Sequence, residues 1–72
     1  MQLYKNLGGN SNILSYDIGD NFIEVQFKNG NKYKYSYRSA GIDKVEKMKV
    51  LAVSGQGLNS YIIREAKYDY ER

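Results

Sequence analysis

The sequence predicts an α+β domain, in which a three-stranded antiparallel meander is followed by two helices packed on one face of the sheet. Residues 12–38 alternate apolar and polar side chains with period two and are interrupted by glycine and asparagine clusters. Residues 43–68 change to a helical period that is broken by two glycines. A chain of 72 residues makes one domain with a thin core. We place that domain at residues 12–72.

The N-terminal segment 1–11 is predicted to be a flexible tail. It ends in the cluster Gly-Gly-Asn-Ser, which favours an irregular backbone. Its candidates for docking onto the domain are three larger side chains: Leu3, Tyr4 and Leu7.

The first predicted strand covers residues 12–18, and its apolar side chains recur at every second position. Those expected to face the core are Leu14, Tyr16 and Ile18. A two-residue turn at Gly19-Asp20 would pair Tyr16 with Ile23 in the next strand, which would unite the apolar faces of both strands.

The second strand, from Phe22 to Lys28, is predicted to join the third through a three-residue loop, 29–31, that sets Phe27 opposite Tyr33. With this register three tyrosines share the face of the core: Tyr33, Tyr35 and Tyr37. The opposite face carries four basic side chains: Lys28, Lys32, Lys34 and Arg38. Lys28 opposite Lys32 would mildly destabilise the hairpin, and a bound anion would relieve that repulsion.

Two helices are expected after Arg38. Asp43 and Glu46 resemble a capping box for the first, and Gly55 suits its end. Its apolar side comprises Val45, Met48, Leu51 and Ala52. Asn59 can cap the second helix, which is predicted to run to about Tyr68. Its apolar stripe comprises Ile62, Ile63 and Ala66, and residues 68–72 are expected to fray.

Composition excludes several classes of function. Without cysteine or histidine the chain has no disulfide, thiolate, zinc site of the usual kind or ordinary general base, so we predict a non-enzymatic protein with no catalytic residue, metal or cofactor. Asp17, Asp20 and Glu24 are better explained as turn and surface residues than as a catalytic cluster. No apolar run approaches the roughly 20 residues of a membrane span, and a cytoplasmic location is the simplest interpretation.

Residues 11 to about 63 resemble the KTSC domain. The similarity includes a Tyr-x-Tyr in the third strand, matched by Tyr33-Lys34-Tyr35 and equally by Tyr35-Ser36-Tyr37. The family's opening residues are matched by Ser11, Ile13, Tyr16 and Asp17. The Val-Pro usual before the first helix is missing, and the family's Asn-x-x-Ile-Arg keeps Asn59 and Ile62 but has Ile63 at the arginine position.

The resemblance implies a small domain that occurs at the C-terminus of some lysyl-tRNA synthetases and as free-standing proteins of bacteria and phages, with RNA binding proposed. Together with a net charge of +3, it favours a nucleic-acid-binding module, most simply for RNA. The expected binding residues are Lys28, Lys32, Lys34, Arg38 and Arg64 for phosphates, and Tyr35 or Tyr37 for stacking.

An alternative function is a protein-interaction or nucleotide-sequestering accessory factor, for example a phage protein that acts on a host enzyme as an oligomer. A thin core, surplus tyrosines and exposed strand edges favour it. The loop Ser54-Gly55-Gln56-Gly57 invites comparison with phosphate-binding loops, but it lacks their Gly-Lys-Ser/Thr ending and is better explained as a connection between helices.

Overall fold

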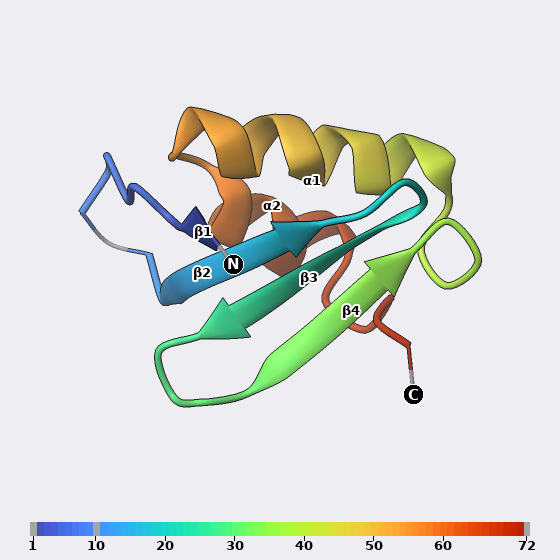
Figure 1. Ribbon diagram of the computed structural model, residues 1–72, viewed down its shortest axis with the longest axis horizontal. Helices are drawn as coiled ribbons and strands as arrows, with labels where there is room; N and C mark the ends of the chain where they lie inside the picture. Colours follow the sequence, from blue (N-terminus) through green and yellow to red (C-terminus); the bar gives the residue numbers. More distant parts are fainter. Residues whose placement is uncertain (1, 10, 72) are drawn as a thin grey trace.

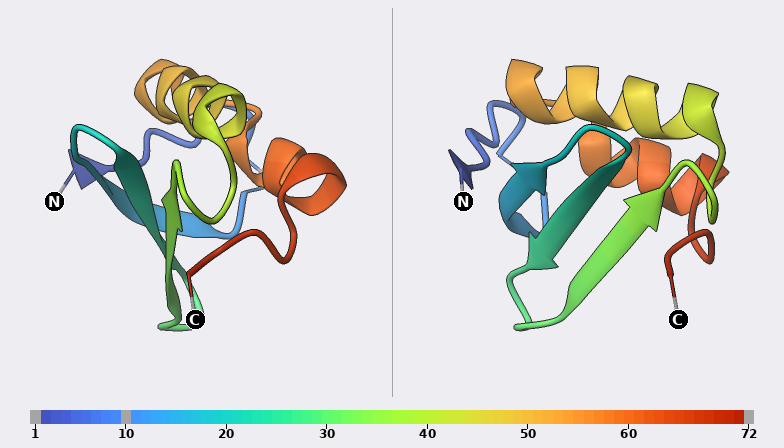
Figure 2. Two further views of the ribbon diagram at one scale, coloured as in Figure 1. Left: turned by 90° about the vertical axis from the view of Figure 1, so that its right-hand side faces the viewer. Right: turned by 45° about the vertical axis from the view of Figure 1, so that its right-hand side comes forward.

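The protein, seen here in a computed structural model that describes residues 2–9 and 11–71, forms a four-stranded antiparallel sheet with two helices (Figure 1). The elements are β1 (Gln2–Leu3), β2 (Ile13–Ile18), β3 (Phe22–Phe27), β4 (Lys32–Ser36), α1 (Ile42–Ser54) and α2 (Leu58–Glu65). The strand order is β1-β2-β3-β4, and both helices lie on the same side of the sheet (Figure 2). The predicted α+β class is confirmed, with one strand more than expected.

A small core fills the space between the sheet and the helices. Its buried apolar side chains are Tyr4, Ile13, Ile23, Val25, Tyr35, Val45, Met48, Ala52, Leu58, Ile62 and Ala66. These side chains come from three strands, both helices, the residue that follows α2 and the N-terminal segment that precedes the predicted domain. The N-terminal segment therefore contributes to the core.

The N-terminal segment contains β1, which the sequence analysis missed. Leu3 pairs with Ser15 of β2, and the backbone N–H of Tyr4 donates to the carbonyl of Leu14. Of the three candidate docking side chains only Tyr4 is buried, while Leu3 and Leu7 are exposed. The Tyr4 hydroxyl accepts a hydrogen bond of 3.3 Å from the N–H of Leu58. Tyr4 thus connects the first strand to the start of α2.

The β2–β3 hairpin has a different register from the predicted one. Tyr16 pairs with Val25 rather than with Ile23, and the N–H of Gly19 donates to the carbonyl of Phe22, so the turn consists of residues 20–21. The Phe22 ring packs over Gly19 so closely that a Cβ there would lie 2.0 Å from the ring. The register differs by two residues, and such a shift by itself does not change the face of a side chain.

A β-bulge in β2 changes which side chain enters the core. The register shifts between Ile13 and Ser15, so Leu14 is the extra residue. The side chain of Ile13 is therefore buried on the side of the sheet that Tyr16 faces, and that of Leu14 is 43% exposed. The prediction that Leu14 faces the core was wrong, because strict alternation does not allow for a bulge.

The β3–β4 hairpin also differs from its predicted register by two residues. Val25 pairs with Tyr33, and the three-residue loop is 28–30, with Gly30 at φ 95°. Glycine adopts this left-handed conformation without the strain that a side chain would bring. Tyr33 lies half-buried and Tyr35 is buried, so the predicted face of these tyrosines is confirmed.

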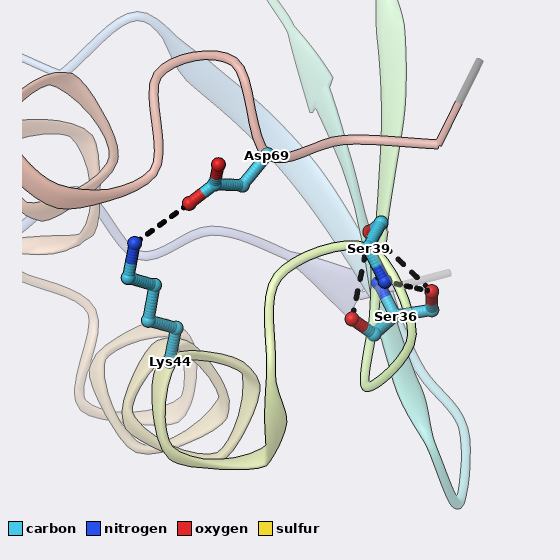
Figure 3. A network of polar contacts seen from close by, with 4 residues as sticks. All are labelled: Ser36, Ser39, Lys44 and Asp69. Carbon is cyan, nitrogen blue, oxygen red and sulfur yellow. Dashed lines mark hydrogen bonds and ion pairs between the residues drawn. The ribbon is translucent and has the colours of Figure 1, made fainter.

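The connection from β4 to α1 is a serine turn. The N–H of Ser36 donates to the Ser39 hydroxyl and the N–H of Ser39 donates to the Ser36 hydroxyl, both at 3.1 Å (Figure 3). Gly41 precedes α1 and no side chain caps the helix, so the expected capping box of Asp43 and Glu46 is absent. The predicted stop at Gly55 is confirmed by its left-handed conformation.

Helix α2 is shorter than predicted and its apolar side is rotated. It begins after Gly57 without a side-chain cap, so Asn59 lies in its first turn rather than capping it. Leu58 and Ile62, four residues apart, are buried, and Ile63 is 54% exposed. Ile63 is therefore a surface residue.

The C-terminal segment was expected to fray, and its contacts with the sheet contradict this. The ring centroid of Tyr70 lies 4.5 Å from that of Tyr33 and 6.3 Å from that of Tyr35. Asp69 forms an ion pair of 2.8 Å with Lys44 of α1 (Figure 3). The N–H of Glu71 donates to the carbonyl of Lys34. The segment thus covers part of the edge of β4.

Candidate polar groove beside helix α2

A polar hollow of about 220 Å³ lies between the N-terminal segment and the start of α2. Five of its lining side chains are neutral amides or hydroxyls: Asn6, Ser11, Gln56, Asn59 and Ser60. Tyr4 supplies a buried aromatic side chain, and Gly8 and Gly57 complete the wall. None of its described lining residues is charged.

A second hollow adjoins the first, and Asn59 lines both. It is bounded by the end of β3, the β3–β4 turn and α2, through Asn12, Phe27, Lys28, Asn29, Asn59 and Ile63. Among the residues described there, Lys28 is the one that is charged, and it is exposed. We call the two hollows together the amide groove.

Several polar groups of the groove are held in place by local hydrogen bonds. The Asn6 side-chain oxygen accepts from the N–H of Ser11, and Asn6 itself adopts φ 54°. The Asn29 side-chain oxygen accepts from the N–H of Asn31 in the β3–β4 turn. These bonds order the loops on both sides of the groove.

The side-chain amides of Gln56 and Asn59, unlike those of Asn6 and Asn29, make no such local hydrogen bond to the described residues. No side-chain hydrogen bond of either residue occurs within residues 2–9 and 11–71, and Asn59 is half-buried. Among the described residues no buried side-chain nitrogen or oxygen lacks a hydrogen-bond partner, so the amide atoms of Asn59 are open to solvent and can be reached by a ligand. Asn59 is therefore the centre of the candidate site.

The predicted basic face is not uniformly basic. Lys34 pairs across the sheet with Glu24, and Lys32 pairs with Gln26. The Lys34 ammonium also lies 4.4 Å from the centroid of the Phe22 ring. The expected pairing of Lys28 with Lys32 does not form, because Lys28 lies in the turn. The predicted repulsion between these two residues across the hairpin was therefore wrong.

The remaining basic candidates are dispersed. Arg38 lies in the turn after β4, where it lines a separate hollow with Ser39, Tyr70 and Glu71. Arg64 is exposed on α2, and its Nε donates to the carbonyl of Ser60, a lining residue of the amide groove. Of the predicted cations, Lys28 is thus the one that lines the groove, and Arg64 is connected to it through the carbonyl of Ser60.

Of the two tyrosines proposed for stacking, Tyr35 does not offer a free ring. Tyr35 is 1% exposed, and burial raises the pKa of its hydroxyl. It therefore cannot stack a base on its ring. Tyr37 is half-buried, and its hydroxyl donates a hydrogen bond of 2.5 Å to Glu46.

Tyr37 belongs to a polar cluster that the sequence analysis did not foresee. The Lys49 ammonium lies 2.8 Å from the Glu46 carboxylate and donates to the carbonyl of Asp20. The hydrogen bond from Lys49, and secondly that from Tyr37, lowers the pKa of Glu46. The hydrogen bond to Glu46 raises the pKa of Tyr37. The cluster attaches the β2–β3 turn to α1.

The glycine loop between the helices is a connection, as expected. The N–H of Gly55 donates to carbonyls at the end of α1, and the N–H of Leu58 donates to the Tyr4 hydroxyl. Within the described ranges, no group of three acidic side chains is arranged to hold a metal ion. Neither described helix has the length and apolar character needed to cross a membrane.

Comparisons of the chain with protein-family models, curated proteins and solved structures find no match. The similarity to the KTSC domain accordingly remains a prediction. The groove itself could have been suspected from one signal in the sequence, the asparagines that stand at the borders of the predicted elements.

Proposed function

We propose that this protein is a non-enzymatic module of the cytoplasm that binds single-stranded nucleic acid at the amide groove, with RNA as its preferred ligand. The observation that carries the proposal is the position of Lys28 at a hollow lined by asparagine amides and the Phe27 side chain. A cation beside amides and an aromatic ring supplies the three contacts used for unpaired strands, to phosphate, base edge and base face.

Charge supports the same surface. Lys28 and Lys32 are both exposed around the β3–β4 turn, and Arg64 is exposed on α2. None of the described residues that line the two hollows is acidic. By contrast, Glu24 accompanies Lys34 on the outer face of the sheet, and Glu71 accompanies Arg38. The groove therefore offers a phosphate the ammonium of Lys28, with no carboxylate among the described lining residues.

A titration tests this proposal. Labelled single-stranded RNA, single-stranded DNA and duplexes of both kinds are titrated with the protein at two salt concentrations, and fluorescence anisotropy is recorded. We expect single strands to bind, with an affinity that falls as salt rises because each phosphate contact releases counterions. Lys28→Glu should weaken binding at least about tenfold, since it places a carboxylate beside the strand.

The matched control is Lys47→Glu, the same charge change at an exposed lysine of α1. It should alter affinity much less than Lys28→Glu, because it changes the net charge without touching the groove. Absence of binding at low salt would contradict the proposal, and so would equal effects of the two variants.

Self-association is a second candidate, favoured by a different surface. Ile18 and Val53 line a hollow beside β1, and Val50 lies three residues before Val53 on α1; all three side chains are exposed. Apolar side chains next to a short edge strand suit contact with a second copy of the chain. Light scattering should then give twice the monomer mass for the wild type and the monomer mass for Val53→Glu. A monomer at high concentration would exclude this candidate.

A further inference from the structure

The first hollow of the amide groove has a chemistry distinct from that of the second. The lining residues that the structure describes offer neutral amides and hydroxyls and no charged side chain. An ionised group bound there would have no counter-charge, so the hollow favours a neutral ligand that has both hydrogen-bond donors and acceptors.

The size of the hollow limits the kinds of ligand that it can hold. About 220 Å³ is below the roughly 300–1,000 Å³ of sites for drug-sized molecules. A single flat ring system fits such a volume better than an oligosaccharide or a peptide side chain with its backbone.

The donors in the hollow identify the kind of ring. A side-chain amide presents a carbonyl oxygen and an NH₂ group side by side, which matches the adjacent acceptor and donor on the edge of a nucleobase. Asn59 and Gln56 are two such amides without a described protein partner. The sugar hydroxyls of a nucleoside lack this planar arrangement.

Tyr4 adds a third group. The side chain is 6% exposed, and its hydroxyl accepts from the N–H of Leu58. No residue in the described ranges accepts the proton of this hydroxyl. A carbonyl oxygen or ring nitrogen of a ligand would satisfy that nearly buried donor.

We propose that this hollow is a pocket for one unstacked nucleobase, held on its edge by the amides of Asn59 and Gln56 and by the Tyr4 hydroxyl. The pocket adjoins the hollow of Lys28 through Asn59, so the base and its phosphate would occupy neighbouring hollows. This inference rests on the proposed function, because it assigns the base of the bound strand to a site.

The experiment uses the full chain labelled with ¹⁵N. Backbone amide signals are followed by NMR while adenosine, guanosine, cytidine or uridine is added, and ribose serves as the ligand without a base. We expect at least one nucleoside to cause saturable shifts at Gly8, Gly57 and Ser60, and ribose to cause none. Asn59→Ala should weaken that binding about tenfold through the loss of one amide.

Asn21→Ala is the matched control, since Asn21 is an exposed asparagine in the β2–β3 turn outside the groove. It should leave the nucleoside affinity unchanged. The base pocket is wrong if no nucleoside shifts these signals at millimolar concentration, or if ribose shifts them equally.

Failure of this inference is distinguishable from failure of the proposed function. Salt-dependent RNA binding that Lys28→Glu weakens, without any nucleoside shift, would retain the nucleic-acid module and remove the base pocket. Nucleoside shifts without RNA binding would instead indicate a site for free nucleosides and overturn both the module and this assignment of a strand's base.

Discussion

At the scale of single residues, Tyr4 shows how one side chain serves both stability and the candidate site. Its ring belongs to the core, and its hydroxyl accepts the N–H of Leu58 at the start of α2. The first N–H groups of a helix lack partners within the helix, and no side chain caps α2. Tyr4 therefore supplies a bond that an ordinary capping residue would make.

Tyr4→Phe keeps the ring and removes this bond. We expect the free energy of unfolding to fall by about 1 kcal/mol, as for a typical hydrogen bond in a protein. Urea denaturation measures it. Tyr68→Phe, at an exposed tyrosine, is the control and should change stability by less than about 0.5 kcal/mol. Equal effects of the two changes would mean that the hydroxyl of Tyr4 contributes nothing.

The cluster of Tyr37, Glu46 and Lys49 predicts how stability depends on acidity. The pKa of Glu46 is lowered in the folded protein, so its contribution is present above its ordinary pKa of 4.5 and is lost as the pH falls through the folded value. The unfolding free energies of the wild type and of Glu46→Gln should therefore converge in acid and separate above pH 4.5.

Denaturation curves recorded between pH 3 and 7 test this expectation. Glu65→Gln is a control at an exposed glutamate of α2. It should leave the pH dependence close to that of the wild type. Parallel curves for the wild type and Glu46→Gln would show that the cluster does not stabilise the fold through the charge of Glu46.

At the scale of elements, the inward faces of β3 and β4 were predictable, whereas the registers and the bulge in β2 were not. Period-two patterning correctly directed Ile23, Val25 and Tyr35 into the core. A slip of two residues preserves every face, so the same pattern is compatible with several registers. Two features of the turns select the observed registers: the contact of the Phe22 ring with Gly19 and the left-handed conformation of Gly30. Both become visible only in the folded structure.

The bulge in β2 gives a sharp test at this scale. Ile13→Ala should cost about 2–5 kcal/mol, because it leaves a cavity in a thin core. Leu14→Ala should cost less than about 1 kcal/mol, because that side chain is already partly exposed. Thermal or urea denaturation compares the two. A larger loss of stability for Leu14→Ala than for Ile13→Ala would contradict the bulge and support the regular alternation predicted from the sequence.

At the scale of the whole molecule, both ends of the chain complete the domain. Tyr4 enters the core from the N-terminal side, and Tyr70 packs on Tyr33 and Tyr35 from the C-terminal side. A sheet and two short helices bury little apolar area by themselves, so the added terminal contacts are a large part of the stability.

A chain that begins at Ser11 tests this contribution. It lacks β1 and Tyr4, and we expect its unfolding free energy to fall by at least about 2 kcal/mol from the lost burial of one aromatic side chain. Leu3→Ala, at an exposed position of β1, should have little effect. Equal stability of the shortened and full chains would restore the flexible tail predicted for residues 1–11.

The sequence by itself determined the class of the fold, the order of its main strands and helices and the inward face of the tyrosine strand, because hydrophobic periodicity is a local property of the chain. The tertiary structure decided the registers, the bulge, the docking of both termini and the amide groove. These depend on contacts between segments far apart in sequence, such as Tyr4 with Leu58 and Tyr33 with Tyr70. For the same reason the predicted basic residues are dispersed, while asparagines that were not predicted to bind converge at the groove.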